Sequence, residues 1–216
     1  MHCARTDRYT LITCHRGRGQ DGIDDAGVLA RFRGVAVHDA WAPYDTYVNA
    51  DHQLCCAHAL RELQAVADTA AQADPDADWC WAIQAAEALV AMQKLVDDAV
   101  AAGVDTIDPD TLGQQVAFYH SAAQVGLTQT AARSTKLMKT HNALARRLLD
   151  RQDDYLRFTQ DWRIPPDNDL VSHCTSWGRC AVSRLVAWSC CRGFRIVACA
   201  SDISGSAGDA VGVAAA

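Results

Sequence analysis

The sequence predicts an α/β fold that carries a long helical insertion. Residues 9–38 alternate between short strands rich in β-branched residues and one brief helix, which is typical of an α/β sheet. From Trp79 to about Trp162, apolar residues recur at helical spacing instead. We therefore expect three segments: a partial core over residues 1–76, a helical insertion over 77–163, and a divergent tail over 164–216.

The expected core begins with two strands and a helix. Tyr9–Cys14 is a strand, and Ile23–Leu29 is a short helix capped by Asp21. Val35–Val37 is a second strand, short, apolar and preceded by glycine. A further brief strand is expected over residues 52–56. Strand, helix and strand within so few residues suggest an α/β sheet, although the crossover is short.

Four helices are expected next. Ala57–Ala70 is the first, and a linker over residues 71–78 follows, in which Pro75 breaks the helix. The second places one apolar stripe inward: Trp81, Ala85, Ala88, Leu89, Met92 and Val96. The third starts at Asp108-Pro109-Asp110. The fourth, Thr135–Phe158, turns the following residues inward: Leu137, His141, Leu144, Leu148 and Tyr155.

Composition excludes several classes of protein. No run of about 18 apolar residues is long enough to cross a membrane. The first residues, MHCARTDRY, have no apolar stretch typical of a signal peptide, so we expect a cytoplasmic protein. The ten cysteines crowd the tail or lie scattered elsewhere, which favours reduced thiols over a disulfide framework. A net charge of −6, with about −12 over residues 39–110, makes the chain a poor general binder of nucleic acid.

Asp39 is the main candidate for chemistry. It directly follows the Val35–Val37 strand and His38, and working groups in α/β sheets lie just past the carboxyl ends of strands. The alternative interpretation is a turn-forming cap without chemical role. Asp167 is a second carboxylate in a Pro-Asp-Asn-Asp turn. Two separated carboxylates that converge on divalent ions suit phosphodiester chemistry, although two alone establish nothing.

Two other clusters have both a structural and a functional interpretation. Four arginines on the last helix form a basic face that is a solvated surface or a phosphate-binding surface: Arg146, Arg147, Arg151 and Arg157. Cys55-Cys56-Ala57-His58 lacks the second ligand pair that a zinc finger needs, so we expect buried thiols there.

Several motifs together resemble the insertion sequence 66 family of bacterial DDE transposases. They are VAVHDAWAPYDTY, LCCAHALREL, ALARRLLDRQDDYLRF and PPDND, in family order between about Ala4 and Asp169. The resemblance implies a ribonuclease-H-like, retroviral-integrase-like core with a helical insertion. It also implies Mg²⁺-dependent cleavage and transfer of DNA strands by three acidic residues.

Carried over by position, Asp39 matches the second acidic residue of that family and would be a catalytic metal ligand. The first aspartate belongs on a central strand upstream of His2, so we expect an incomplete core. The family glutamate should follow the Asp167-Asn168-Asp169 turn, yet no glutamate occurs after Glu87. Cys56 also stands where the family commonly has asparagine.

The resemblance leaves three interpretations of function. The first is a truncated, catalytically inactive transposase fragment whose ancestor moved DNA and was nucleoid-associated when DNA-bound. The second is a non-catalytic regulator that binds DNA or a full-length transposase. The third is a pseudogene product without function, with a tail that is disordered or read from a shifted frame.

Overall fold

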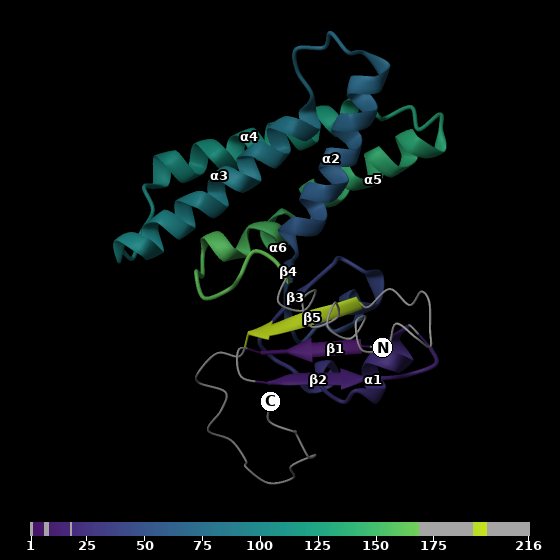
Figure 1. The fold of residues 1–216 in the computed structure, drawn as a ribbon, viewed down its shortest axis with the longest axis vertical. Helices are drawn as coiled ribbons and strands as arrows, with labels where there is room; N and C mark the ends of the chain where they lie inside the picture. The colour runs from purple at the N-terminus through teal and green to yellow at the C-terminus, as the bar shows by residue number, and fades with distance from the viewer. Residues whose placement is uncertain (1, 7–8, 18, 169–191, 198–216) are drawn as a thin grey trace, which may run out of the picture. The chain divides into compact units, whose positions relative to one another are not determined.

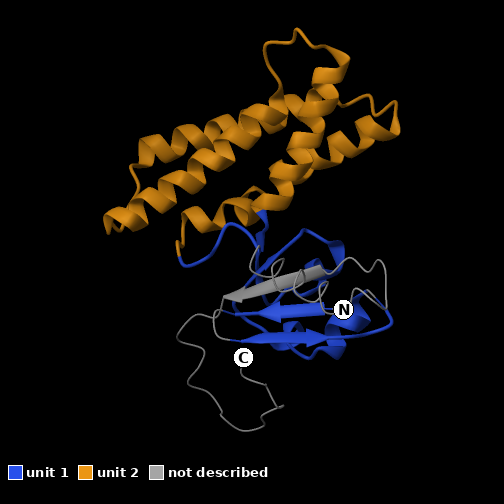
Figure 2. Ribbon diagram, in the orientation of Figure 1, with its two compact units in different colours: residues 1–55, 163–216 blue, residues 56–162 orange. Residues whose placement is uncertain are grey.

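The computed structural model describes residues 2–6, 9–17, 19–168 and 192–197. Figure 1 shows one sheet and a group of long helices, and Figure 2 colours the two compact units to which they belong. The first unit comprises residues 1–55 and 163–216, and the second comprises residues 56–162. Within the described residues, no helix is long and apolar enough to cross a membrane.

The first unit is built on a five-stranded sheet with the strand order β2-β1-β5-β3-β4. Its strands are β1 (His2–Arg5), β2 (Thr10–Thr13), β3 (Val35–His38), β4 (Asp51–Leu54) and β5 (Arg192–Val197). The sheet is mixed: β1–β2 and β3–β5 pair antiparallel, whereas β1–β5 and β3–β4 pair parallel. The strands expected near residues 9–14, 35–37 and 52–56 are thus present, whereas β1 was not expected.

The central strand comes from the segment expected to lie outside the fold. In β5, Arg192 lies opposite His2 of β1, and Val197 lies opposite Val35 of β3. The expectation that the whole tail is separate is therefore wrong for residues 192–197. Phe194, Ile196 and Val197 give this short stretch the composition of a strand. The remaining tail, residues 169–191 and 198–216, lies outside the described residues.

Short helical pieces connect the strands of the first unit. They are α1 (Gln20–Asp25), η1 (Leu29–Arg31) and η2 (Ala42–Thr46). The N-cap of α1 is Gly19, and Asp21 lies inside the first turn, so the predicted Asp21 cap is wrong. The buried apolar cluster over these pieces comprises Ala4, Ile23, Leu29, Ala36, Tyr44 and Tyr47.

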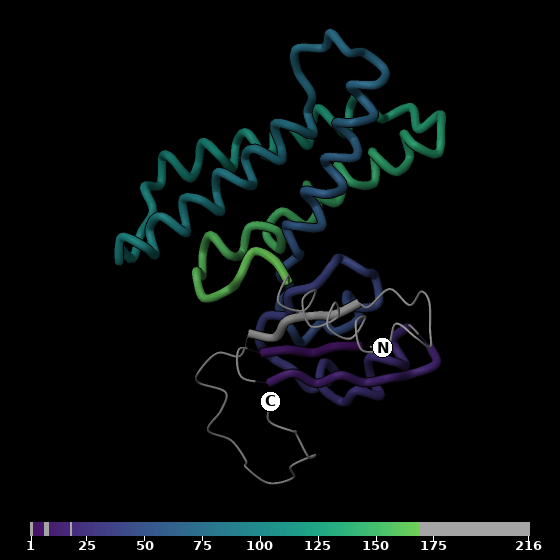
Figure 3. Tube along the Cα trace, viewed as in Figure 1, coloured from purple at the N-terminus to yellow at the C-terminus, as the bar shows by residue number. Residues whose placement is uncertain are grey.

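The second unit is wholly helical, and Figure 3 traces the chain through it as one continuous excursion. Its elements are α2 (Cys56–Ala73), α3 (Trp81–Ala102), α4 (Pro109–Gln129), α5 (Lys136–Asp150), α6 (Gln152–Leu156) and η3 (Arg157–Thr159). Helix α3 lies beside both α2 and α4, and α5 packs on α4. Because α2 packs on α3, it belongs to this unit, and the boundary falls after Cys55 instead of residue 76.

Local signals in the sequence account for most of these helices. All six residues of the predicted α3 stripe are buried. Asp108 caps α4 by accepting a 2.9 Å hydrogen bond from the Thr111 amide, and Thr135 caps α5 in the same way at 3.1 Å from Met138. Gly103 ends α3 at a φ of 66°, a left-handed conformation that glycine adopts without strain.

The last predicted helix differs from the structure in two respects. It is interrupted at Arg151, whose φ of −116° and ψ of 27° separate α5 from α6. Leu137 is 49% exposed rather than inward. The buried stripe of α5 runs through Asn142, Ala145 and Leu148, so the inward place in the first turn falls to Met138.

Candidate functional site at the end of strand β3

Asp39 lies directly after β3, as predicted. Strands β3 and β4 are parallel and in register, with His38 opposite Leu54, so their carboxyl ends lie at the same edge of the sheet. The Cys55 amide donates a 2.8 Å hydrogen bond to the His38 carbonyl and extends this pairing past the end of the strands. Asp39 therefore starts from a fixed backbone position.

The carboxylate of Asp39 shapes the turn that follows. Its Oδ1 accepts a 3.2 Å hydrogen bond from the Trp41 amide, the local bond of an Asx turn. Between them, Ala40 has a φ of 59°, a left-handed conformation that costs a residue with a Cβ about 1–2 kcal/mol. Asp39 is only half-buried, so the residue that forms this turn is still partly exposed.

Two histidines lie next to Asp39 in a hydrogen-bonded chain. The Ala40 amide donates to His38 Nδ1 at 3.2 Å, which places the proton of the neutral ring on Nε2. His38 Nε2 lies 2.9 Å from His52 Nδ1 and donates to it, so the proton of His52 lies on its Nε2. The ring nitrogens that face each other are thereby occupied, and they are poorly placed to ligate a metal ion.

Two aromatic side chains pack on the His38 side of this pair. The rings of His38 and Tyr44 have centroids 4.6 Å apart, and Trp41 meets Tyr44 edge-on at 5.8 Å. Tyr44 and His38 are fully buried. The segment after β3 therefore packs as part of the core and does not form an open loop.

A second carboxylate of the first unit, that of Asp24, accepts a hydrogen bond with a structural role. Tyr47 donates a 2.7 Å hydrogen bond from its hydroxyl to Asp24 Oδ1. Burial, together with the hydrogen bond and the charge of Asp24, raises the pKa of the Tyr47 hydroxyl, so it stays protonated as a donor. This bond ties η2 to the end of α1.

The donor set around Asp39 does not fit a pair of divalent cations. Among the described residues, no group of three or more His, Cys, Asp and Glu side chains is arranged to hold a metal ion. Asp167 is half-buried and Asn168 is buried, while Asp169 lies outside the described residues. Two-ion phosphodiester chemistry needs several convergent carboxylates, and the described residues around Asp39 do not supply them.

The four candidate arginines belong to the helical unit and do not form one free basic face. Arg147 donates to Glu62 Oε2 at 2.6 Å and to the Tyr155 hydroxyl at 2.9 Å. Arg151 and Arg157 both pair with Asp154.

The fourth arginine is different. Arg146 is exposed and makes no ion pair with another described residue. Sequence spacing did not reveal the break at Arg151, which leaves Arg157 in η3, or the acidic partners of these arginines, one of which comes from α2.

The Cys55-Cys56 pair matches the expectation of buried thiols. Both side chains are buried thiols, and Cys56 Sγ donates a 3.5 Å hydrogen bond to the Tyr155 carbonyl. What the sequence reasoning missed was the His38–His52 pair. Both residues adjoin predicted strands, and a parallel register between these strands was the signal that could have brought them together.

Comparison with known proteins gives one match. The model of the IS66 transposase family matches residues 1–172, which include the whole helical unit and residues 1–55 and 163–172 of the sheet unit, and end before β5. No curated protein and no solved structure matches the chain.

Proposed function

Because this chain belongs to the IS66 transposase family, we propose that it is a transposition-related protein that has lost DNA strand cleavage. The intact family would cleave and transfer DNA strands with three carboxylates and divalent cations. In this chain Asp39 matches one of those carboxylates. The proposal is therefore a catalytically inactive relative, with a ribonuclease-H-like ancestry for its first unit.

The proposal rests on which acidic residues this chain has available to hold metal ions. The chain has no glutamate after Glu87, so the family's third acidic residue has no counterpart in the tail. Asp39 is held by the Trp41 amide in a turn, and its histidine neighbours bond each other. A site that lacks this third carboxylate is poorly suited to hold two divalent ions in line with a phosphodiester.

The test of inactivity is a nicking assay on supercoiled DNA. We expect the purified full chain to produce no nicks with Mg²⁺ or Mn²⁺, while an active family member does so in parallel. Circular dichroism of the same sample must show folded protein. Nicking by this chain that disappears in Asp39→Asn would overturn the proposal, since further acidic groups would then complete the site.

We further propose that DNA contact, where it occurs, depends on Arg146. A guanidinium paired with a carboxylate must give up that partner before it binds phosphate, and Arg147 is already bound to Glu62 and Tyr155. Arg146 carries no such cost. Lys136 and Lys139 belong to the same helix and add to the local positive charge of α5.

Fluorescence anisotropy with a labelled DNA duplex tests this contact. Arg146→Gln should weaken binding about two- to fivefold at low salt and reduce the salt dependence by about one ion. Arg61→Gln, an exposed arginine on α2, is the matched control and should change little. Arg147→Gln should lower stability more than DNA affinity, and equal losses in all three variants would contradict a role specific to Arg146.

A second candidate function is a regulator that binds a full-length transposase without cleaving DNA. The observation that favours it is the helical unit, which has capped helices and a continuous buried core from Trp81 to Phe158. Co-purification with an active family member, together with inhibition of its strand transfer, would support this function. Absence of both would leave a protein without a regulatory role.

A further inference from the structure

The helical unit contains a groove between α2 and α3 that no activity described above uses. Two hollows, of about 470 Å³ and about 400 Å³, share Ala67, Ile83 and Glu87 in their walls and so lie along one open groove. We call it the α2–α3 groove. Its α3 wall is the stripe Ile83, Glu87, Val90 and Lys94.

Large apolar side chains are left open along this groove. Ile83 and Val90 are 48% and 50% exposed, although they stand on the same helix as the fully buried Leu89 and Met92. At one end Trp79 and Phe118 are 48% and 45% exposed. Clustered exposed apolar residues with a polar border are typical of a protein-binding site.

The aromatic end of the groove is held in place by hydrogen bonds. The Trp79 indole donates to Gln84 Oε1 at 2.9 Å, and Gln84 Nε2 donates to the Phe118 carbonyl at 3.1 Å. These two hydrogen bonds link Trp79, which precedes the N-cap residue of α3, to α4. An exposed tryptophan that is already ordered loses little entropy on binding, which suits an anchor residue of an interface.

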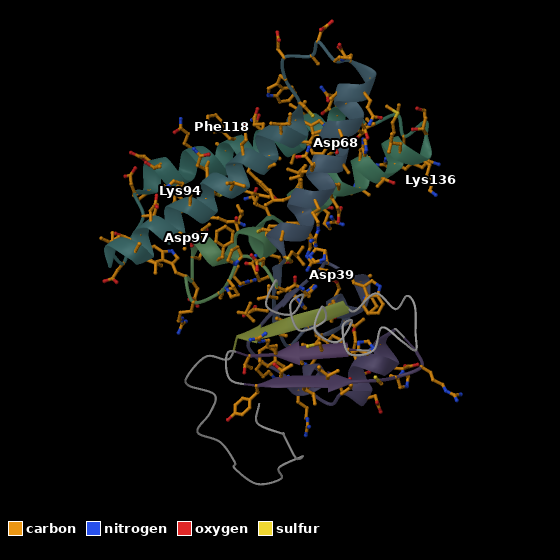
Figure 4. All side chains as sticks on the ribbon, in the orientation of Figure 1. Asp39, Asp68, Lys94, Asp97, Phe118 and Lys136 are labelled. Atoms are coloured by element: carbon orange, nitrogen blue, oxygen red, sulfur yellow. The ribbon has the colours of Figure 1, made fainter. Side chains whose placement is uncertain are left out.

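The border of the groove is acidic. Residues 62–93 contain six acidic residues and no lysine or arginine. Asp74, Asp78 and Glu87 line the groove, and Glu87 has no hydrogen-bond or ion-pair partner within the described part of the chain. The basic residue at the far end, Lys94, is paired with Asp98 at 2.6 Å. Figure 4 labels Asp68 on α2 and Lys94 and Asp97 on α3.

We propose that the α2–α3 groove docks a basic amphipathic helix of a partner protein. A groove between two packed helices accepts the row of side chains along a third helix. Ile83, Glu87 and Val90 are spaced at i, i+4 and i+7 on α3, and apolar residues of the partner helix at the same spacing can contact them. The rise from Ile83 to Lys94 is about 16 Å, so the partner helix engages about three turns. Lysine or arginine on its flanks complements the acidic border.

Other occupants fit this groove less well. Negative charge repels nucleic acid, so DNA is excluded as its ligand. A second copy could offer the basic residues of α5, but among the described residues the only large apolar side chain strongly exposed on α5 is Leu137. This single apolar side chain would leave most of the groove unfilled.

The test titrates two labelled peptides into the full chain. Both are 14-residue amphipathic helices with leucine at i, i+4, i+7 and i+11, one with lysine and the other with glutamate on its flanks. We expect saturable binding of the basic peptide at least tenfold tighter than the acidic one, and weaker binding at higher salt. Tryptophan emission should shift to the blue in the wild type and not in Trp79→Phe.

Matched variants locate the binding site. Val90→Asp and Glu87→Lys, both at exposed positions, should weaken the basic peptide at least tenfold while the circular dichroism spectrum stays unchanged. Val100→Asp places the same change on an exposed residue of α3 outside the groove and should have no effect.

Three results would overturn the proposal. They are no saturable binding, equal affinity for the two peptides, and equal losses in Val90→Asp and Val100→Asp. Self-association that Val90→Asp abolishes would assign the groove to a second copy instead, and would also overturn it. None of these outcomes depends on whether the chain cleaves DNA.

Discussion

The two units of this protein are put together in opposite ways. The helical unit is one uninterrupted segment, residues 56–162, whose helices each contact the next along the chain. The sheet unit joins four short strands from the first 55 residues to a fifth from residues 192–197. Strand β5 pairs with His2 across almost the whole length of the chain.

The stability of the helical unit therefore depends on residues near each other in sequence, and that of the sheet unit on residues far apart in sequence. Each helix carries its own periodic pattern and, in α4 and α5, its own cap, so the helical unit depends on signals within a few residues. In the sheet, β1 and β3 are both paired with β5 and not with each other. Loss of one short segment should therefore divide the sheet, while no single helical signal has this importance.

The strongest test of the comparison removes β5. A chain that ends at residue 172 should lose about a hundredfold or more of the amide exchange protection in β1 and β3, or roughly 3 kcal/mol, since two separate two-stranded ribbons are barely stable. Protection in α3 and α4 should remain. Hydrogen exchange with mass spectrometry measures both units in one sample.

A chain that ends at Val197 is the control for this truncation, because it keeps β5. If both truncated chains protect the sheet equally, β5 does not hold the two halves together.

The next effect concerns packing between two helices. A Cβ at Gly126 of α4 would lie 2.5 Å from a ring carbon of the buried Trp81, so Gly126→Ala should destabilise the helical unit by about 1–3 kcal/mol. A Cβ at Gly113 of the same helix meets nothing, and Gly113→Ala should stabilise it by about 0.5–1 kcal/mol. Urea unfolding followed by circular dichroism measures both. The same sign for the two variants would contradict this packing.

A smaller effect comes from one buried hydrogen bond. Tyr119 is fully buried and donates a 2.8 Å hydrogen bond from its hydroxyl to the Leu148 carbonyl, which links α4 to α5. Tyr119→Phe leaves that carbonyl without its donor and should cost about 1–2 kcal/mol in urea unfolding. Tyr9→Phe makes the same change on an exposed ring of the sheet unit and should cost nothing measurable.

The smallest expected effect is a dependence on pH. Burial lowers the pKa of His141 below its ordinary value of 6.5. The unfolded chain then binds a proton before the folded one, so this contribution to stability is present above pH 6.5 and is lost as the pH falls below it. His141→Gln should make the helical unit lose less stability between pH 7.5 and pH 5.5. An identical loss in variant and wild type would show that other groups govern the acid response.

The sequence predicted the helical unit better than the sheet unit. The reason is again the difference between local contacts and contacts distant in sequence. The α3 stripe and the Asp108 cap were predictable because the spacing of apolar residues and the identity of the capping residue can both be recognised within a few turns of sequence. Strand β5 and the His38–His52 bond were not, because pairing partners distant in sequence leave no local pattern. The break at Arg151 was missed for a related reason, since the apolar pattern continues through it.

For the candidate site, the sequence placed Asp39 correctly at the end of a strand and could say little about its neighbours. The Asx turn, the left-handed Ala40 and the enclosing Tyr44 ring follow from how the next eight residues fold back. Likewise, the pairing of Arg147 with Glu62 joins residues far apart in the sequence. Charge counts alone therefore overstated the free basic surface.

The origin of β5 also has a consequence for synthesis on the ribosome. The helical unit, which ends at Trp162, is translated about thirty residues before Arg192. At about 5–20 residues per second, this delay amounts to roughly 2–6 seconds. During that time the nascent chain holds a complete set of helices but two strand ribbons with open edges, which are the edges that chaperones and neighbouring nascent chains encounter.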